Sequence, residues 1–98
     1  MRRFDEKVVL VTGAASGIGR ACVERMAGEG AKVACVDVQS EAVEETARLA
    51  RAQGSQALAW VCDVSDPASV RTCVDKAVAE FGRLDSLCNI AGILHFDN

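Results

Sequence analysis

The stretch "VTGAASGIG", residues 11–19, places glycines at positions 13, 17 and 19 directly after the apolar run "KVVLV" (7–11). The run has the composition of a buried strand, and the residues after it have the apolar spacing of a helix. Glycine at such a junction lets the backbone turn sharply and approach a ligand closely. The stretch therefore predicts a strand, a tight turn and a helix, in that order.

This junction suits a pyrophosphate, because the first turn of a helix offers unpaired backbone N–H groups and a positive dipole end. Gly13 tolerates the turn's dihedral angles, Gly17 has no side chain to block the phosphates, and Gly19 lets the helix lie close to the sheet. Ser16 and Ile18 flank these glycines and belong to the same candidate site. The alternative is an ordinary tight turn with no ligand.

An acidic residue follows the second apolar run, "AKVACV" (31–36). The Asp37 carboxylate can accept hydrogen bonds from the adenosine ribose hydroxyls of NAD, and it would repel the additional phosphate of NADP. Neither Val38 nor Ala15 supplies a positive charge to offset that repulsion. The sequence thus predicts NAD rather than NADP; the alternative is a solvated acid that ends a strand.

Apolar runs and helical patterns alternate along the whole chain. The predicted strands are 7–11, 31–36, 57–61 and 84–88, and the predicted helices are 17–29, 40–53 and 67–81. The residues of the first helix predicted to face inward are Ile18, Ala21, Cys22 and Met26. Ser65 or Asp66 can cap the third helix, and Gly82 can end it. The expected fold is α/β, a Rossmann-type doubly wound parallel sheet with only its first four strands and three helices present.

Composition excludes several other classes. The formal net charge of −3 argues against nucleic acid as a partner, and no apolar run is long enough for a membrane span. Five cysteines, an odd number without Cys-x-x-C spacing, predict reduced thiols that pack as small hydrophobic residues in a cytoplasmic protein. A metal site or a disulfide framework is the alternative.

Three segments together resemble the short-chain dehydrogenase/reductase family: "TGAASGIG" (12–19), "CDVSD" (62–66) and "CNIAG" (88–92). The resemblance spans essentially the whole chain. It implies that Asp63, with Val64 beside it, binds the adenine amino group, although Asp63 could instead cap the next helix. It also implies that Asn89, Ala91 and Gly92 form the floor under the nicotinamide-side ribose. We expect the Thr12 hydroxyl to hold the central strands together rather than to touch the cofactor.

Two departures from the family pattern stand out. Ile90 replaces the second asparagine of the third motif. The family's catalytic serine, Tyr-x-x-x-Lys pair and asparagine lie well beyond that motif, whereas this chain has no tyrosine and its last lysine is Lys76. No catalytic residue is therefore assigned, and His95 is expected to be a solvated bystander.

The resulting hypothesis is that residues 1–98 form the cofactor-binding half of an NAD-dependent dehydrogenase whose catalytic part lies outside this sequence. The complete enzyme would transfer hydride between a secondary alcohol or ketone and nicotinamide, as a homo-oligomer. The isolated chain would not turn over alcohols. The alternatives are a non-catalytic nucleotide-binding or subunit-pairing module, and another adenosine-binding Rossmann protein such as a methyltransferase. The latter does not account for Thr12 or the Asn89 segment.

Overall fold

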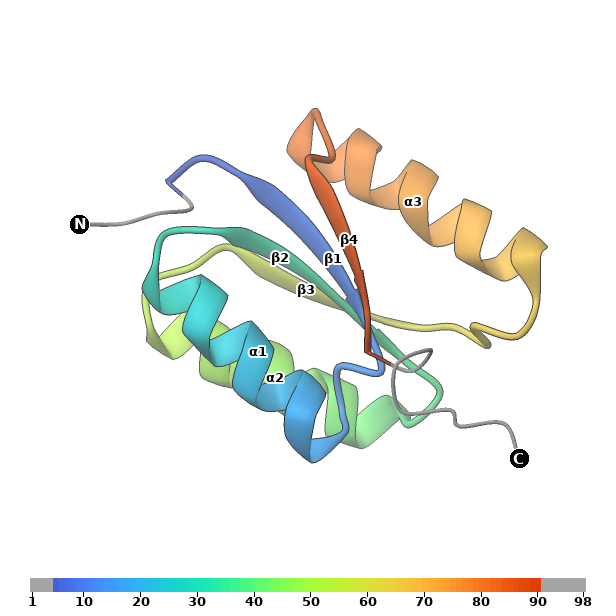
Figure 1. The fold of residues 1–98 in the computed structure, drawn as a ribbon, viewed down its shortest axis with the longest axis horizontal. Coiled ribbons are helices and arrows are strands. Elements are labelled where there is room, and N and C mark those ends of the chain that lie inside the picture. Colours follow the sequence, from blue (N-terminus) through green and yellow to red (C-terminus); the bar gives the residue numbers. More distant parts are fainter. Residues whose placement is uncertain (1–4, 91–98) are drawn as a thin grey trace.

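The computed structural model describes residues 5–90, which fold as four strands and three helices in strict alternation (Figure 1). The elements are β1 (Val8–Thr12), α1 (Gly17–Gly28), β2 (Lys32–Asp37), α2 (Ser40–Ala52), β3 (Ala57–Val61), α3 (Pro67–Phe81) and β4 (Ser86–Asn89). Every predicted element is present, and its bounds agree with the prediction to within two residues.

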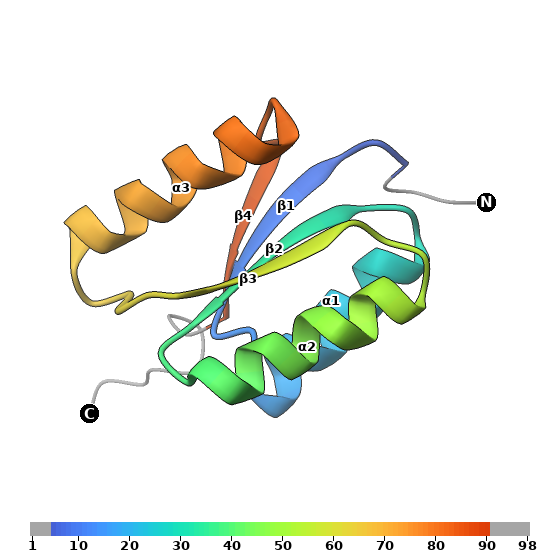
Figure 2. The ribbon, with the colours of Figure 1, turned by 180° about the vertical axis from the view of Figure 1, so that it is seen from behind.

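All four strands are parallel and lie in the order β3-β2-β1-β4. Helices α1 and α2 cover one face of the sheet and α3 covers the other, as the two opposite views show (Figures 1 and 2). The α/β, doubly wound arrangement predicted from the alternating pattern is confirmed. Because the chain crosses from β1 outward to β3 and then returns to β4, the strand order reverses beside β1.

The core has two layers, one on each face of the sheet, and β1 contributes to both. Val9 and Val11 face α1 and α2, whereas Leu10 faces α3 with Val36 and Ala77. All five residues of β1 are buried. Burial on both faces explains why the strand sequences are continuous apolar runs rather than alternating ones.

The ends of α3 show how local sequence fixes an element. Asp66 caps the helix by accepting a hydrogen bond from the Ala68 N–H at 3.1 Å, and Pro67 occupies the first helical position. Gly82 ends the helix with φ of 85°, a left-handed conformation that glycine adopts without strain. Of the two predicted caps, Asp66 is the one used.

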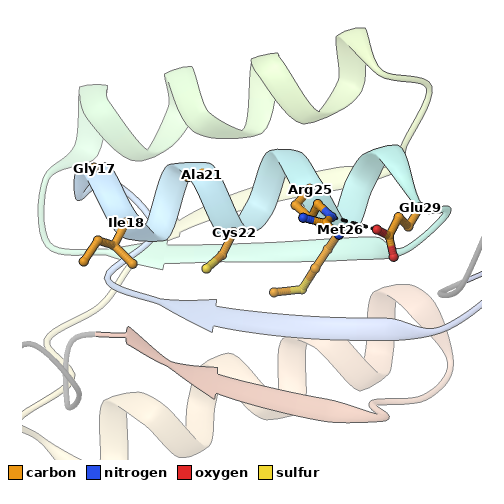
Figure 3. A pocket seen from close by; sticks show the side chains of 7 residues that line it. All are labelled: Gly17, Ile18, Ala21, Cys22, Arg25, Met26 and Glu29. Atoms are coloured by element: carbon orange, nitrogen blue, oxygen red, sulfur yellow. Dashed lines mark hydrogen bonds and ion pairs between the residues drawn. The ribbon is translucent and has the colours of Figure 1, made fainter.

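The buried face of α1 differs from the prediction. The residues of α1 that are actually buried are Gly19, Val23 and Ala27, whereas Ile18 is 52% exposed and Ala21 is also exposed. Cys22 and Met26 are only partly buried at the margin of the core. The four residues predicted to face inward, Ile18, Ala21, Cys22 and Met26, instead line an open groove along the flank of α1 (Figure 3). Gly19, whose position is too close to Gly13 for a side chain, belongs to the buried face of α1.

The five cysteines are free thiols, and Cys35, Cys62 and Cys73 are buried in the core. Burial raises the pKa of Cys35 to about 12 and that of Cys62 to about 11, so both are protonated at neutral pH. They pack as small hydrophobic residues, as predicted.

Within residues 5–90, no cluster of acidic, histidine or cysteine side chains could hold a metal ion, and no helix could cross a membrane.

Candidate cofactor-binding site

The predicted site residues that lie within residues 5–90 gather at one edge of the sheet, where the parallel strands end. In the strand register, Thr12 at the end of β1 lies between Val36 of β2 and Asn89 of β4. The Cys62 N–H donates to the carbonyl of Asp37 at 3.0 Å, which brings the segment after β3 to the end of β2. The carboxyl edge of an open parallel sheet is where such folds bind ligands.

The turn between β1 and α1 is closed by its own hydrogen bonds. Gly13 has φ of 70°, in the left-handed region that favours glycine. The Ser16 hydroxyl donates to the Gly13 carbonyl at 2.8 Å and accepts from the Gly19 N–H at 3.0 Å. Ser16 is therefore the cap of α1, and it joins the start of the turn to the first turn of the helix.

Gly19 is required by packing. A Cβ atom at this position would lie 2.8 Å from the carbonyl carbon of Gly13 and still closer to its oxygen. Such an overlap is forbidden, so no other residue fits without moving the backbone. The close approach that was predicted between helix and sheet is in fact an approach between the helix and the turn.

Gly17 is different, because a Cβ there would meet no atom within 4 Å. The amides of Gly17 and Ile18 are the first two of α1, where no earlier helical turn supplies a carbonyl. No cap or turn hydrogen bond within residues 5–90 uses them. Two unpaired donors thus lie at the positive end of a helix, next to the open space beside Gly17, which is a suitable place for a phosphate group.

Asp37 is 7% exposed, and its carboxylate is bonded to two backbone amides. One oxygen, Oδ2, accepts from the Ala15 N–H at 2.9 Å, and the other, Oδ1, accepts from the Gln39 N–H at 3.1 Å. A carboxylate has about four acceptor positions, so it can accept further hydrogen bonds. Asp37 therefore anchors the glycine-rich turn and still has acceptor capacity, which argues against a merely solvated acid.

Asp63 is exposed and forms a local turn. Its Oδ1 accepts from both the Ser65 N–H, at 2.9 Å, and the Ser65 hydroxyl, at 2.6 Å. These hydrogen bonds hold the pKa of the Asp63 carboxyl below its ordinary value. Because Asp66 caps α3, the alternative role for Asp63 as that cap is wrong. Val64, beside it, is half-buried against the α3 layer of the core.

At the end of β4, the Thr12 hydroxyl donates to the Asn89 Oδ1 at 2.7 Å. This bond joins β1 and β4, and it confirms the role predicted for Thr12. Ile90, which replaces the second asparagine of the motif, is 3% exposed and packs into the α1–α2 layer of the core. The predicted site residues Ala91 and Gly92, together with His95, lie outside the described residues.

Comparison with known proteins decides the family. The family described as short chain dehydrogenase matches residues 7–98. The chain belongs to the short-chain dehydrogenase family. It is 46% identical over 91 residues to a D-threitol dehydrogenase from Mycolicibacterium smegmatis, covering 93% of this chain and 35% of that protein.

Solved structures of dehydrogenases resemble this chain. An NAD⁺-bound xylitol dehydrogenase is 41% identical with a TM-score of 0.83, over 87% of this chain and 33% of that one. A carveol dehydrogenase from Mycobacterium avium in complex with NAD is 30% identical with a TM-score of 0.84, over 89% and 36% of the two chains. The chain spans about a third of the length of the relatives it matches.

Two residues of this short-chain dehydrogenase sequence that belong to no predicted motif form a chain of hydrogen bonds to the turn. Thr46 of α2 donates its hydroxyl proton toward the carbonyl of Ala14 at 3.0 Å, and Arg20 of α1 donates to Thr46 at 3.0 Å. Thr46 lies on the buried face of α2 with Val43, Ala47 and Ala50. A polar residue on this otherwise apolar face is the sequence signal that could have indicated a role for Thr46.

Proposed function

We propose that this chain is the dinucleotide-binding part of an NAD-dependent short-chain dehydrogenase. One observation carries the proposal: the unpaired Gly17 and Ile18 amides and the buried Asp37 carboxylate flank a single turn. The amides suit the pyrophosphate, and the carboxylate suits a ribose with free hydroxyls. NAD-bound relatives of similar structure support the same cofactor class.

Each residue of the turn then has a defined role. Gly13 and Ser16 set the path of the backbone, Gly19 allows the helix to begin close to it, and the absence of a side chain at Gly17 leaves room for the phosphates. Asp37 would repel a phosphate on the 2′ position of the ribose. Val38 and Gln39, which follow it, carry no positive charge.

The exposed carboxylate of Asp63 and the neighbouring Val64 are assigned to the adenine ring, and Asn89, Ala91 and Gly92 to the ribose on the nicotinamide side. Bound NAD would supply the hydride acceptor for a secondary alcohol, or NADH the donor for a ketone. Since the 98 residues contain no tyrosine, we assign them no catalytic residue and expect the chain alone to bind NAD without turnover. The cytoplasmic location of the protein and the homo-oligomeric state of the complete enzyme stay predictions.

Calorimetric titration of the chain with NAD and NADP tests the proposal. We expect NAD to bind at least about tenfold more tightly, because like charges a few ångströms apart cost a kcal/mol or more. Asp37→Asn should shrink that ratio. Asp75→Asn on α3 removes the same charge from an exposed position remote from the turn, and should leave the ratio unchanged. Tighter binding of NADP by the unaltered chain, or binding of neither, would contradict the proposal.

A second candidate is the subunit-pairing module. It has one observation in its favour: among residues 5–90, β4 is an edge strand that pairs with β1 alone, and Leu87 on it is 45% exposed. The mass of the native protein discriminates between the two candidates. A longer native species would favour the dehydrogenase, whereas an intact species of 98 residues that self-associates without binding NAD would favour the module.

A further inference from the structure

One peptide group within the glycine-rich turn is held from both sides. Its N–H, from Ala15, donates to the Asp37 Oδ2 at 2.9 Å, and its C=O, from Ala14, accepts from the Thr46 hydroxyl at 3.0 Å. Ala14 is fully buried. The Ala14–Ala15 peptide is thus fixed between the end of β2 and the middle of α2, and its orientation sets that of the Asp37 carboxylate.

The Thr46 hydroxyl has two acceptors within reach but only one proton to donate. The Ala14 carbonyl lies at 3.0 Å and the Ala42 carbonyl, one helical turn earlier in α2, at 3.2 Å. The Arg20 guanidinium resolves this competition. Its Nη2 donates to the Ala42 carbonyl at 3.0 Å, while its Nε donates to the Thr46 oxygen, also at 3.0 Å.

Arg20 therefore satisfies the competing carbonyl and leaves the hydroxyl proton for Ala14. Thr46 is completely buried and so is its bond to the Ala14 carbonyl, so water cannot replace that bond, whereas the bonds of Arg20 are only partly buried. A second threonine shows what the ordinary arrangement is. Thr72 on α3 is exposed, and its hydroxyl donates to the carbonyl of Ala68, four residues earlier, at 3.0 Å. That bond stays within one helix and reaches no turn.

We propose that Thr46 and Arg20 are positioning residues for the cofactor: they fix the Ala14–Ala15 peptide and, through it, the Asp37 carboxylate that selects the adenosine ribose. Neither residue touches the dinucleotide. The assignment rests on the proposed function, because the ribose is taken as the ligand of Asp37. It extends that function because part of the selectivity for NAD over NADP would then depend on Thr46 of α2 and Arg20 of α1, which lie outside the turn.

Four variants test the proposal. Thr46→Val keeps the shape but removes the hydroxyl, Thr46→Ser keeps the hydroxyl, and Arg20→Met removes both guanidinium donors while keeping an apolar stem. Thr72→Val is the matched control, since it removes a helical threonine hydroxyl that contacts no turn. Two quantities are measured in each: amide hydrogen exchange of Ala15 in the ligand-free chain, and the ratio of the NADP and NAD dissociation constants.

In Thr46→Val we expect Ala15 exchange to accelerate about tenfold relative to the core amides, and the preference for NAD to fall about tenfold, as for one lost hydrogen bond. Arg20→Met should change both quantities in the same direction by a smaller factor. Thr46→Ser and Thr72→Val should stay within about twofold of the unaltered chain. A merely structural role would weaken NAD and NADP equally and leave their ratio unchanged.

Unchanged Ala15 exchange or an unchanged ratio in Thr46→Val overturns the assignment, as does an equal effect of Thr72→Val. If Thr46→Val does not fold, Arg20→Met decides by the same two criteria. Failure of the unaltered chain to bind NAD overturns the proposed function, and the positioning role falls with it. Binding by the unaltered chain with no response in the variants overturns the positioning role alone.

Discussion

Asp37 and Asp63 both follow strands at the same edge of the sheet, yet their surroundings differ sharply. Asp37 is 7% exposed, and its carboxylate bonds to amides 22 residues earlier and two residues later. Asp63 is exposed, and its carboxylate accepts hydrogen bonds from the backbone N–H and the hydroxyl of Ser65, two residues on. One carboxylate is held by the tertiary structure and the other by a local turn.

This difference divides the candidate site into two regions. The turn region, made of residues 13–19 and Asp37, has its backbone fixed by contacts from β2 and α2. The region around Asp63, which we propose binds the adenine and call the adenine region, is shaped by hydrogen bonds within its own short segment. We infer that the turn region is preorganised for its ligand, whereas the adenine region contributes less to stability. Substitutions in the two regions should therefore have effects of different kinds and sizes.

The largest effect is expected for Gly19→Ala. The added Cβ overlaps the backbone of Gly13, and neither the helix nor the turn can move without breaking the Ser16 cap. We expect a loss of about 3 kcal/mol or more in the free energy of unfolding, at the upper end of overpacking effects. For a domain of this size, thermal denaturation followed by circular dichroism should show a fall of more than about 10 °C. An unchanged melting temperature would contradict the close approach.

Gly17→Ala is the matched substitution in the same helical turn and should behave differently. Its Cβ meets nothing, and alanine is favoured over glycine in helices by up to about 1 kcal/mol, so stability should be equal or higher. The same methyl group occupies the space assigned to the phosphates, so NAD affinity should fall at least about tenfold by calorimetry. If the affinity for NAD does not fall, Gly17 does not contact the phosphates and its assignment to the phosphate site is wrong.

The smallest effect on stability is expected for Asp63→Ala. Because hydrogen bonds from Ser65 lower the pKa of Asp63, its ionised form stabilises the folded chain above about pH 4, and this contribution is lost as pH falls through the lowered pKa. The variant and the unaltered chain should thus differ slightly at neutral pH and converge in acid. Urea denaturation between pH 7 and pH 2 measures this, and a difference that grows in acid would contradict it.

Much of this fold is predictable because its boundaries are marked locally. Gly13 and Gly82 adopt positive φ values at the ends of elements, and Asp66 with Pro67 opens α3. Strands buried on both faces stand out as continuous apolar runs. Within residues 5–90, the motifs lie at the ends of strands, as predicted, since parallel strands bring their carboxyl ends to one edge.

What the sequence did not predict depends on how the elements pack together. In α1 the stripe of Ile18, Cys22 and Met26 is as apolar as the buried stripe of Gly19, Val23 and Ala27, and the close approach of Gly19 to the turn belongs to the buried one. The bond from Thr46 to Ala14 joins residues 32 apart, so it exists only once α2 has docked. Helical periodicity contains no information about either contact.

The central claim is that the glycine-rich turn and Asp37 bind the dinucleotide, and amide chemical shifts of the ¹⁵N-labelled chain during titration with NAD test it most directly. We expect saturable shifts at Gly17 and Ile18, whose N–H groups are assigned to the phosphates, and at Ala15, which is bonded to Asp37. Shifts absent at these three amides, or confined to the groove along the flank of α1 at Ala21 and Met26, would contradict the account.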